Sequence, residues 1–327
     1  MPHRPILDPS GGFRRIPLQP HQLTKPITPA EDVFVLAHLG VPRVDPATWT
    51  LEIDGLVRHP GRYTLNELKR YPLHRVRSVH NCAGNPLNPR VPTRRIANVV
   101  WGGVELRTLL DEAGVDETAS HVWSYGADYG EFNGTYCESY LKDLPLSRLD
   151  AGDVLVAYEL NGEHLTAEHG FPVRLLVPGW YGTNSVKWLS RMTLADRRAA
   201  GLFTTVLYND VVSEIEGDSP PSLNPTWEIA PDSVIVAPEP DERRPVAKSG
   251  EIWGWAWAAA GIRTVEISVD GGRTWRAAAV EPRERWSWQR LSHGNRWRPG
   301  RSPSSPALPT SAGRFSHRVV LGTPFIP

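Results

Sequence analysis

A proline-rich connector near residue 220 divides this chain of 327 residues into two parts with different patterns. Residues 219–225 contain three prolines. Before them, short apolar strands alternate with helical segments, and after them apolar and polar residues alternate along strands separated by turns. The chain is also long for one domain. We therefore expect two domains, and the 31 prolines and 28 glycines favour short strands, many turns and little helix.

The part before the connector predicts a mixed α+β domain. Residues 49–55 alternate apolar and polar positions and end at a glycine, as a strand does. Residues 154–160 and 173–177 are apolar runs that are typical of buried strands. Together these segments predict a sheet with a buried centre.

Two short helices are expected in the same part. Residues 64–70 predict a helix with Thr64 as its N-cap, because Glu67 stands three positions later and completes a capping box. Residues 106–113 predict a second helix. Gly114 follows directly and predicts the end of that helix.

The part after the connector predicts a sandwich of the immunoglobulin type. Residues 233–237 read as a strand, and residues 251–257 place three tryptophans on one face at period two. Residues 265–269 alternate again, and the Asp-Gly-Gly sequence at 270–272 predicts a hairpin turn. Tryptophans on such strands are expected in the core or an interface rather than on a ligand-binding surface.

The end of the chain departs from this pattern. No acidic residue follows Glu284, and arginines accumulate among Pro, Ser and Gly, with only residues 315–321 hinting at a strand. A solvated, disordered tail and a truncation or frameshift that removed the last strands both explain this, and both stay open. The expected organisation comprises an N-terminal arm (1–30), an α+β domain (31–220), an immunoglobulin-like domain (221–290) and an atypical tail (291–327).

Charge and composition exclude several partners. The 36 basic and 36 acidic residues give no net charge, whereas nucleic acids and anionic membranes select a basic excess. No apolar run is long enough to span a membrane, and the first 30 residues lack the apolar core of a signal peptide, so a cytoplasmic location is expected. Cys82 and Cys137 form no disulfide framework, although one bridge between them stays open.

Cys82 has the setting of a metal ligand. It stands where a strand enters a loop, with Asn81 and Asn85 beside it and Gly84 allowing close backbone approach. A single soft thiolate suits a soft, high-valent metal whose other sulfur ligands come from elsewhere. The two cysteines are 55 positions apart, and this separation and the absence of CxxC or HExxH patterns argue against zinc. A small buried cysteine without function is the alternative.

A second segment predicts an anion site. His169, Arg174 and Lys187 place three cationic or hydrogen-bonding heads on one strand and loop. Two glycines, at positions 179 and 182, free the backbone there, so that amide groups can also face an anion. A phosphate or a pterin requires such a set of donors. An ordinary strand with solvated basic residues is the alternative.

The order and spacing of five segments resemble the core of the sulfite oxidase family. These are 81–85 (NCAGN), 101–106 (WGGVEL), 159–163 (ELNGE), 169–174 (HGFPVR) and 185–189 (SVKWL). Residues 253–257 (WGWAW) and 269–275 (VDGGRTW) resemble the dimerisation domain of that family. The resemblance covers residues 31–290 and implies an α+β sulfite-oxidase-type molybdopterin-binding domain, followed by an immunoglobulin-like β-sandwich through which a homodimer forms.

The resemblance also implies a molybdenum-molybdopterin cofactor and a role for particular residues. Cys82 matches the thiolate that binds molybdenum, and Tyr208 matches an active-site tyrosine near the oxo group. The positions expected to hold the cofactor are His38, Asn81, Cys82, His169, Arg174, Ser185 and Lys187. No haem domain is expected in this chain, so electrons would leave to a separate acceptor.

Two departures from the family concern the substrate. Leu36 and Leu87 stand where sulfite-oxidising members usually carry arginines that offset the desolvation of an anion. Arg90, Arg94 or Arg95 are candidates to replace them. Two-electron oxygen-atom transfer is predicted, first the oxidation of sulfite or a related small sulfur compound. Reduction of a neutral S-oxide is one alternative, and a non-catalytic interaction protein that keeps the fold is another.

Overall fold

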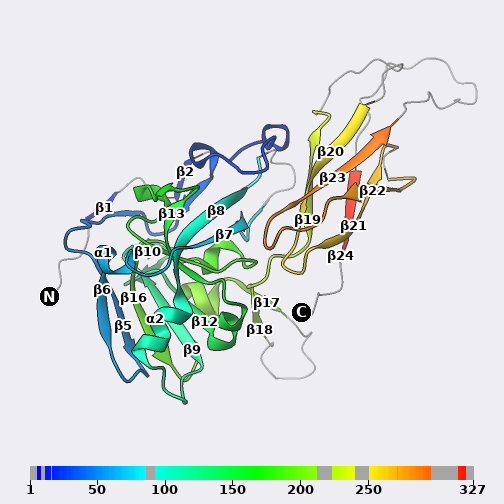
Figure 1. The fold of residues 1–327 in the computed structure, drawn as a ribbon. Helices are drawn as coiled ribbons and strands as arrows, with labels where there is room; N and C mark the ends of the chain where they lie inside the picture. Colours follow the sequence, from blue (N-terminus) through cyan, green and yellow to red (C-terminus); the bar gives the residue numbers. More distant parts are fainter. Residues whose placement is uncertain are drawn as a thin grey trace, which may run out of the picture. The chain divides into compact units, whose positions relative to one another are not determined.

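A computed structural model of the chain is built mainly of strands (Figure 1). It describes residues 6–8, 12–15, 17–85, 93–211, 223–239, 250–270, 272–295 and 316–321. The chain divides into two compact units. The first comprises Met1–Pro17, Ile27–Asn85 and Arg95–Glu228, and the second comprises Leu18–Pro26, Pro86–Arg94 and Ile229–Pro327. The boundaries predicted for the arm, the two domains and the tail stay predictions.

Two five-stranded sheets organise the described part of the first unit. One has the order β12 (Leu141–Pro145), β9 (His121–Gly126), β16 (Leu189–Ala195), β5 (Thr50–Gly55) and β6 (Gly61–Thr64). The other has the order β14 (Glu163–His164), β13 (Leu155–Leu160), β8 (Ile96–Glu105) and β7 (His74–Asn81), with β15 (Arg174–Leu176) also paired to β13. Neighbouring strands are antiparallel except β16 and β5. The strands predicted at 49–55, 154–160 and 173–177 are therefore confirmed as β5, β13 and β15.

Short strand pairs and single helical turns complete this unit. The pairs are β1 (Ile6–Asp8) with β4 (Val41–Arg43), β2 (Gly12–Arg15) with β3 (Val35–Ala37), β10 (Gly130–Phe132) with β11 (Thr135–Cys137), and β17 (Asn209–Val211) with β18 (Leu223–Pro225). The 3-10 turns are η2 (Ala30–Asp32), η3 (Leu146–Ala151), η4 (Ala167–His169) and η5 (Gly182–Asn184), and η6 (Leu202–Val206) is a π-helix. A further 3-10 turn, η1 (Pro20–Gln22), belongs to the second unit.

Both predicted helices are confirmed. Helix α1 (Leu65–Leu68) begins after Thr64, whose side chain accepts a hydrogen bond from the Glu67 amide, while the Glu67 carboxylate accepts one from the Thr64 amide. Helix α2 (Leu106–Ala113) ends at Gly114, which has a φ of 65° in the left-handed region. None of the helices in the described residues has the length and apolar character needed to cross a bilayer.

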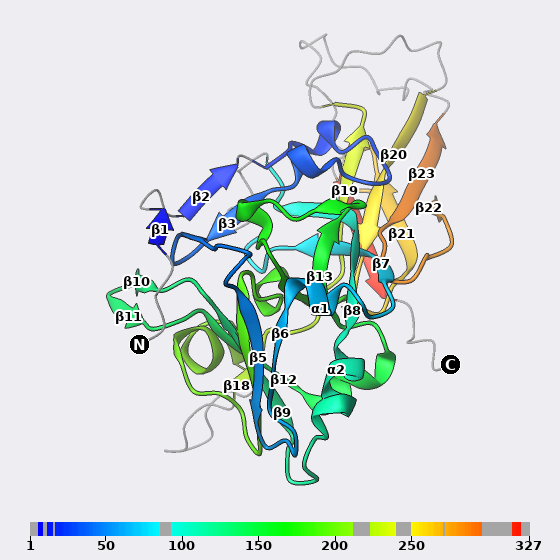
Figure 2. The same ribbon diagram turned by 60° about the vertical axis from the view of Figure 1, so that its left-hand side comes forward.

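Helix α2 packs its apolar face into the core of the first unit, beside the sheet that contains β5 and β9 (Figure 2). The same core cluster also contains residues of β5, β9 and β16, including Leu51, Ile53, Val122, Met192 and Leu194. The centre of the other sheet is buried as well, with β8 and β13 almost entirely shielded from solvent. Strands β7 and β15 are held by this buried sheet, so the loops that follow them start from fixed positions.

The second unit contains one antiparallel sheet among its described residues. Its order is β19 (Asp232–Ala237), β20 (Gly250–Trp257), β23 (Gln289–Asn295), β22 (Arg276–Val280), β21 (Ile262–Ser268) and β24 (Ser316–Leu321). The strands predicted at 233–237, 251–257 and 265–269 are confirmed, and the hint at 315–321 corresponds to β24, which pairs with β21. The rest of the predicted tail, 296–315 and 322–327, lies outside the described residues. The immunoglobulin-type sandwich stays a prediction.

The tryptophans of β20 are mostly buried, as expected. Trp255 stacks on Trp288 with ring centroids 4.7 Å apart, and Trp257 is 2% exposed. The indole N–H of Trp255 donates to the Leu23 carbonyl at 2.6 Å, and that of Trp288 donates to the Pro26 carbonyl at 3.0 Å. These side chains therefore join β20 and the residue before β23 to residues 18–26 of the same unit.

We predict that Gly114→Ala destabilises the protein by about 1–2 kcal/mol, because an L residue is strained at a φ of 65°. Gly61→Ala is the matched control, since φ there is not left-handed and the added Cβ would lie 3.6 Å or more from Tyr63. Urea unfolding of both variants measures the difference. Equal free energies of unfolding for the two variants would contradict the assignment of Gly114 as a conformationally required helix end.

Candidate active site

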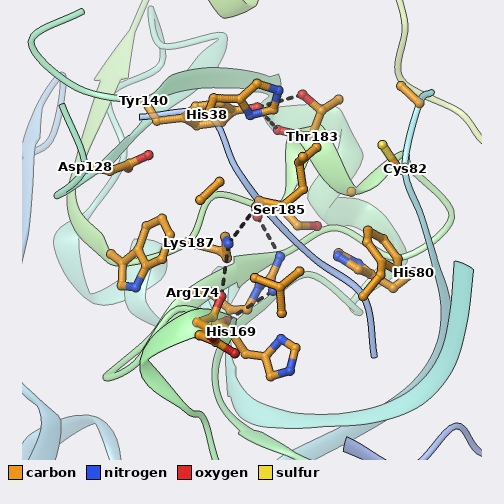
Figure 3. Close-up of a pocket in the computed structure, with 18 of the residues that line it drawn as sticks. His38, His80, Cys82, Asp128, Tyr140, His169, Arg174, Thr183, Ser185 and Lys187 are labelled. Atoms are coloured by element: carbon orange, nitrogen blue, oxygen red, sulfur yellow. Dashed lines mark hydrogen bonds between the residues drawn. The ribbon is translucent and has the colours of Figure 1, made fainter. Parts of the chain in front are cut away.

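A cavity in the first unit, with about 700 Å³ of empty space that includes its opening to solvent, brings most of the predicted site residues together (Figure 3). The predicted residues that line it are His38, Cys82, His169, Arg174, Ser185, Lys187 and Tyr208. They come from segments between positions 38 and 208, so the fold gathers what the sequence separates. Leu36 lines the cavity as well, whereas Leu87 and Arg90 lie outside the described residues.

Cys82 follows β7 directly and is held by its backbone. Its amide donates to the carbonyl of Arg95 at 3.0 Å, and the thiol lines the cavity. Cys82 and Cys137 are both free, which settles the alternative of a bridge between them. No group of three or more His, Cys, Asp or Glu side chains among the described residues is arranged to hold a metal ion.

Asn81 is the one predicted site residue that does not line the cavity. It is buried, and its side-chain oxygen accepts a hydrogen bond from the side-chain amide of Asn85 at 3.0 Å. The side-chain oxygen of Asn85 in turn accepts from the Arg95 amide at 2.6 Å. Successive residues of an extended segment point to opposite faces, so Asn81 points away from the cavity that Cys82 lines. Through Asn85 it instead shapes the loop around Cys82.

The guanidinium of Arg174 connects two loops beneath the cavity. This side chain on β15 is 3% exposed and donates to the carbonyl of His169 at 3.2 Å and of Ser185 at 2.9 Å. It also lies over the ring of Trp101, 4.7 Å from the centroid. Burial lowers the pKa of Arg174 to about 9. Its Nε has no hydrogen-bond partner among the described residues, so one donor of a buried cation is open to a ligand.

Lys187 reaches the same region from the loop before β16. Its ammonium donates to the carbonyl of Leu36 at 2.8 Å and of Glu168 at 3.0 Å. Gly170 allows the close packing, because it has a φ of 104° and a Cβ there would lie 3.1 Å from the Cβ of Lys187 and 3.2 Å from that of Arg174. The predicted cationic heads are therefore packed into one wall of the cavity.

His80 lines the cavity and was not predicted as a site residue. Its ring stacks on Phe34 with centroids 5.6 Å apart. Burial lowers the pKa of His80 well below its usual range, and the charges of Arg174 and other cations add to this effect. The alternation of a strand is the signal that identifies it, since His80 stands two residues before Cys82 and shares its face.

Three further residues that line the cavity are Asp128, Tyr140 and Thr183. Asp128 is 3% exposed, and burial raises its pKa to about 7 although the nearby charge of Lys187 acts in the opposite direction. Its Oδ1 has no hydrogen-bond partner among the described residues. The hydroxyl of Tyr140 lies 2.9 Å from the carbonyl oxygen of Thr183, to which it donates, and 2.7 Å from its hydroxyl.

Tyr208 and His38 form a hydrogen-bonded pair. The hydroxyl of Tyr208 lies 2.8 Å from Nε2 of His38. Burial lowers the pKa of His38 to about 4, with the charge of Lys187 as a second cause. Burial, and then the charge of Cys82, raise the pKa of Tyr208 to about 12. At neutral pH the pair therefore consists of an uncharged imidazole and a protonated phenol close to Cys82.

Comparison with known proteins identifies the family. Residues 38–203 match the family described as oxidoreductase molybdopterin binding domain, and residues 224–298 match the Mo-co oxidoreductase dimerisation domain. The chain is 32% identical over 292 residues to the sulfite oxidase of Gallus gallus, covering 80% of this chain and 61% of that protein. It is 32% identical over 303 residues to an NAD(P)H nitrate reductase of Hordeum vulgare, covering 80% of this chain and 33% of that protein.

Among solved structures, the sulfane dehydrogenase SoxCD from Paracoccus pantotrophus is similar, with a TM-score of 0.72 and 30% identity over 85% of this chain and 71% of that chain. This chain belongs to the molybdopterin-binding oxidoreductases of the sulfite oxidase family, as the sequence predicted. The cofactor of the family is molybdenum-molybdopterin. The chain spans between a third and about three fifths of the length of the curated relatives named above.

The residues of the cavity fit this cofactor. Arg174 Nε and Asp128 Oδ1 are buried polar atoms without partners among the described residues, as a bound group with both acceptors and donors would require. Gly182 lines the cavity, and a Cβ there would lie only 2.9 Å from the ring of His80, so a larger residue would fill the space. One thiolate, a cationic wall and a buried carboxyl together match a sulfur-ligated metal on a phosphorylated pterin.

We predict that Asp128→Asn makes the cofactor-free protein more stable relative to wild type as pH rises from about 4 to 7. In wild type the unfolded carboxyl ionises near pH 4, whereas the folded one holds its proton up to about 7, so folding loses stability across this range. The asparagine variant does not share this loss, which is on the order of a few kcal/mol. Denaturant unfolding at several pH values measures it. A difference that stays flat with pH would contradict the burial of a protonated Asp128.

Proposed function

We propose that this protein catalyses two-electron oxygen-atom transfer on a small sulfur compound, at a molybdenum held by Cys82. The observation that carries the proposal is the single cavity in which the thiol of Cys82 faces an uncharged tyrosine–histidine pair and a cationic wall. The names of the relatives support the choice of substrate class, because they refer to the oxidation of sulfite and the dehydrogenation of sulfane.

When bound, the molybdenum-molybdopterin supplies the two-electron redox chemistry. The thiolate of Cys82 would be the one protein ligand to the metal, and His169, Arg174 and Lys187 would offset the negative charge of the phosphate. Ser185 would add a polar contact at the same wall. His169, Arg174 and Ser185 are buried, and the side chains of Arg174 and Lys187 are fixed by bonds to backbone carbonyls, so the site needs little reorganisation to receive the group.

Tyr208 would act on the substrate. Its phenol stays protonated at neutral pH, so its O–H can donate to an oxygen of the substrate beside the metal ligand. His38 would donate from Nε2 to the phenol oxygen, which fixes the hydroxyl and leaves its O–H for the substrate. Buried Asp128 would accept from an N–H of the pterin, because its Oδ1 lacks a partner among the described residues.

Oxidation of sulfite or a related small sulfur compound is the first candidate reaction. Reduction of a neutral S-oxide is the second, and the apolar side chain of Leu36 in the cavity favours it. A doubly charged anion there would need a compensating cation, whereas the described cationic side chains of the cavity would already offset the phosphate of the cofactor. We further propose an immunoglobulin-like second domain that forms a homodimer, and a separate electron acceptor.

We predict that Cys82→Ser keeps near-stoichiometric pterin but loses the absorption band of a molybdenum thiolate. The cationic wall is intact in this variant, so the pterin would still bind, whereas a serine hydroxyl does not replace the soft ligand. Protein made in a host that synthesises the cofactor is assayed for molybdenum, released pterin and absorption.

Cys137→Ser is the matched control, because Cys137 is the other free cysteine and does not line the cavity. It is expected to keep metal, pterin and the absorption band. Folded wild-type protein without metal or pterin would sink the enzyme proposal and favour a non-catalytic interaction protein. An unchanged band in Cys82→Ser would overturn the ligand assignment alone.

We predict that Leu36→Arg lowers the KM for sulfite by about 10-fold or more, since a charge-assisted hydrogen bond to an anion contributes about 1.5–3 kcal/mol. The same change should not lower the KM for a neutral S-oxide such as dimethyl sulfoxide. Steady-state kinetics with both substrates measures the two effects. An equal change in both KM values would show that position 36 does not select substrate charge.

A further inference from the structure

Lys142 on β12 is a buried lysine outside the cavity. The whole residue is 1% exposed, and its ammonium donates to the carbonyl of Phe203 at 2.8 Å. This is its one hydrogen bond within the described part of the chain, although an ammonium has three donors. Burial lowers the pKa of Lys142 to about 8, so burial of this charge is unfavourable. An apolar side chain would fill the same space without that cost.

The carbonyl that Lys142 binds belongs to the π-helix η6 (Leu202–Val206). Single π-helical turns are rare and are frequently found at functional sites. Tyr208 stands two positions after the end of this turn and has a φ of 60°, which is strained for a residue other than glycine. A conformation of this kind persists only where its surroundings hold it.

Lys142 contacts Tyr208 as well as the turn before it. Its ammonium lies 5.4 Å from the centroid of the Tyr208 ring, within cation–π range. Asn209 closes the turn from the other end, since its side-chain amide donates to the carbonyls of Thr204 at 3.1 Å and Leu207 at 2.9 Å. The same lysine thus binds the backbone before the tyrosine and covers the tyrosine ring.

The next residue of β12 anchors the same turn through an arginine. Asp143 is buried and accepts from Arg198 in a bidentate pair, at 3.0 and 3.1 Å. Arg198 also donates to the carbonyl of Thr204 at 3.4 Å. Two successive carbonyls of the π-helix, those of Phe203 and Thr204, are therefore bound by buried or half-buried cations anchored at β12.

We propose that Lys142 is a positioning residue for Tyr208. By binding the carbonyl of Phe203 and covering the tyrosine ring, its ammonium holds the strained turn, so that the Tyr208 hydroxyl stays on His38 at the cavity. Lys142 does not line the cavity, so it acts through Tyr208 and not on a ligand. This inference rests on the role of Tyr208 in the proposed function.

The test compares Lys142→Met with Lys69→Met. Methionine keeps the length and volume of lysine without its charge or donors. Lys69 is the matched control, because it also lies over a tyrosine ring, 5.9 Å from the centroid of Tyr158, but is exposed and outside the cavity. Amide hydrogen exchange of peptides covering residues 202–209 is measured in cofactor-free and pterin-loaded protein. We expect Lys142→Met to speed this exchange by about 10-fold or more, and Lys69→Met to leave it unchanged.

A double-mutant cycle with Tyr208→Phe gives the second readout. In pterin-loaded enzyme, Lys142→Met should lower kcat by about 10-fold with little change in KM, and should add less than about 2-fold in the Tyr208→Phe background. A lysine that merely supported the fold would lower activity by the same factor in both backgrounds. Lys142→Gln replaces Lys142→Met should the latter not fold, because glutamine keeps a donor but lacks the charge and the reach.

Unchanged exchange of residues 202–209 together with multiplicative effects on kcat would overturn the positioning role. Exchange in the cofactor-free protein does not depend on turnover, so it separates this inference from the proposed function. If the protein loads no pterin but Lys142→Met still speeds the exchange of residues 202–209, the positioning role of Lys142 stands and the proposed reaction is wrong. If the protein loads pterin and is active, but Lys142→Met leaves the exchange of residues 202–209 unchanged and its effect on kcat is independent of Tyr208→Phe, the proposed reaction stands and the positioning role of Lys142 is wrong.

Discussion

The buried guanidinium of Arg174 is the interaction on which the rest of the cavity depends. It binds one carbonyl from η4, that of His169, and one from the loop before β16, that of Ser185, while its plane lies on the ring of Trp101. Two loops and the centre of β8 are thereby fixed around one cation. Lysine could not take this place, because its point charge lacks the planar fork that reaches two acceptors and a ring face together.

Local signals were sufficient for the helices and for much of the site. Thr64 caps the beginning of α1 and Gly114 ends α2, through bonds and dihedral angles within a few residues. The local sequence is therefore enough to predict these helix boundaries. Asn81 was expected at the cofactor, but its side chain turns to Asn85, because neighbours along a strand face opposite sides. The same alternation identifies His80, two residues before the cysteine, as a lining residue.

Other features depend on contacts between segments far apart in the chain. Asp128 and Tyr140 reach the cavity through the pairing of β9 with β12 and β16. No pattern near Tyr140 predicts that position. Lys142 reads as an ordinary charged residue until β12 places it against η6. Strand β24 is obscured by a composition rich in Arg, Pro and Ser, and it becomes evident only through its register with β21.

Leu36 contacts the cationic wall through its backbone and also lines the cavity. Lys187, in the cationic wall, donates to the backbone carbonyl of Leu36, while the residue itself lines the cavity. The bond that joins wall and loop therefore does not depend on which side chain position 36 carries. A change there can alter the charge offered to a substrate while the contact with Lys187 stays. In the proposed function, substrate charge and cofactor binding are therefore separable, because one would use the side chain and the other the backbone of the same residue.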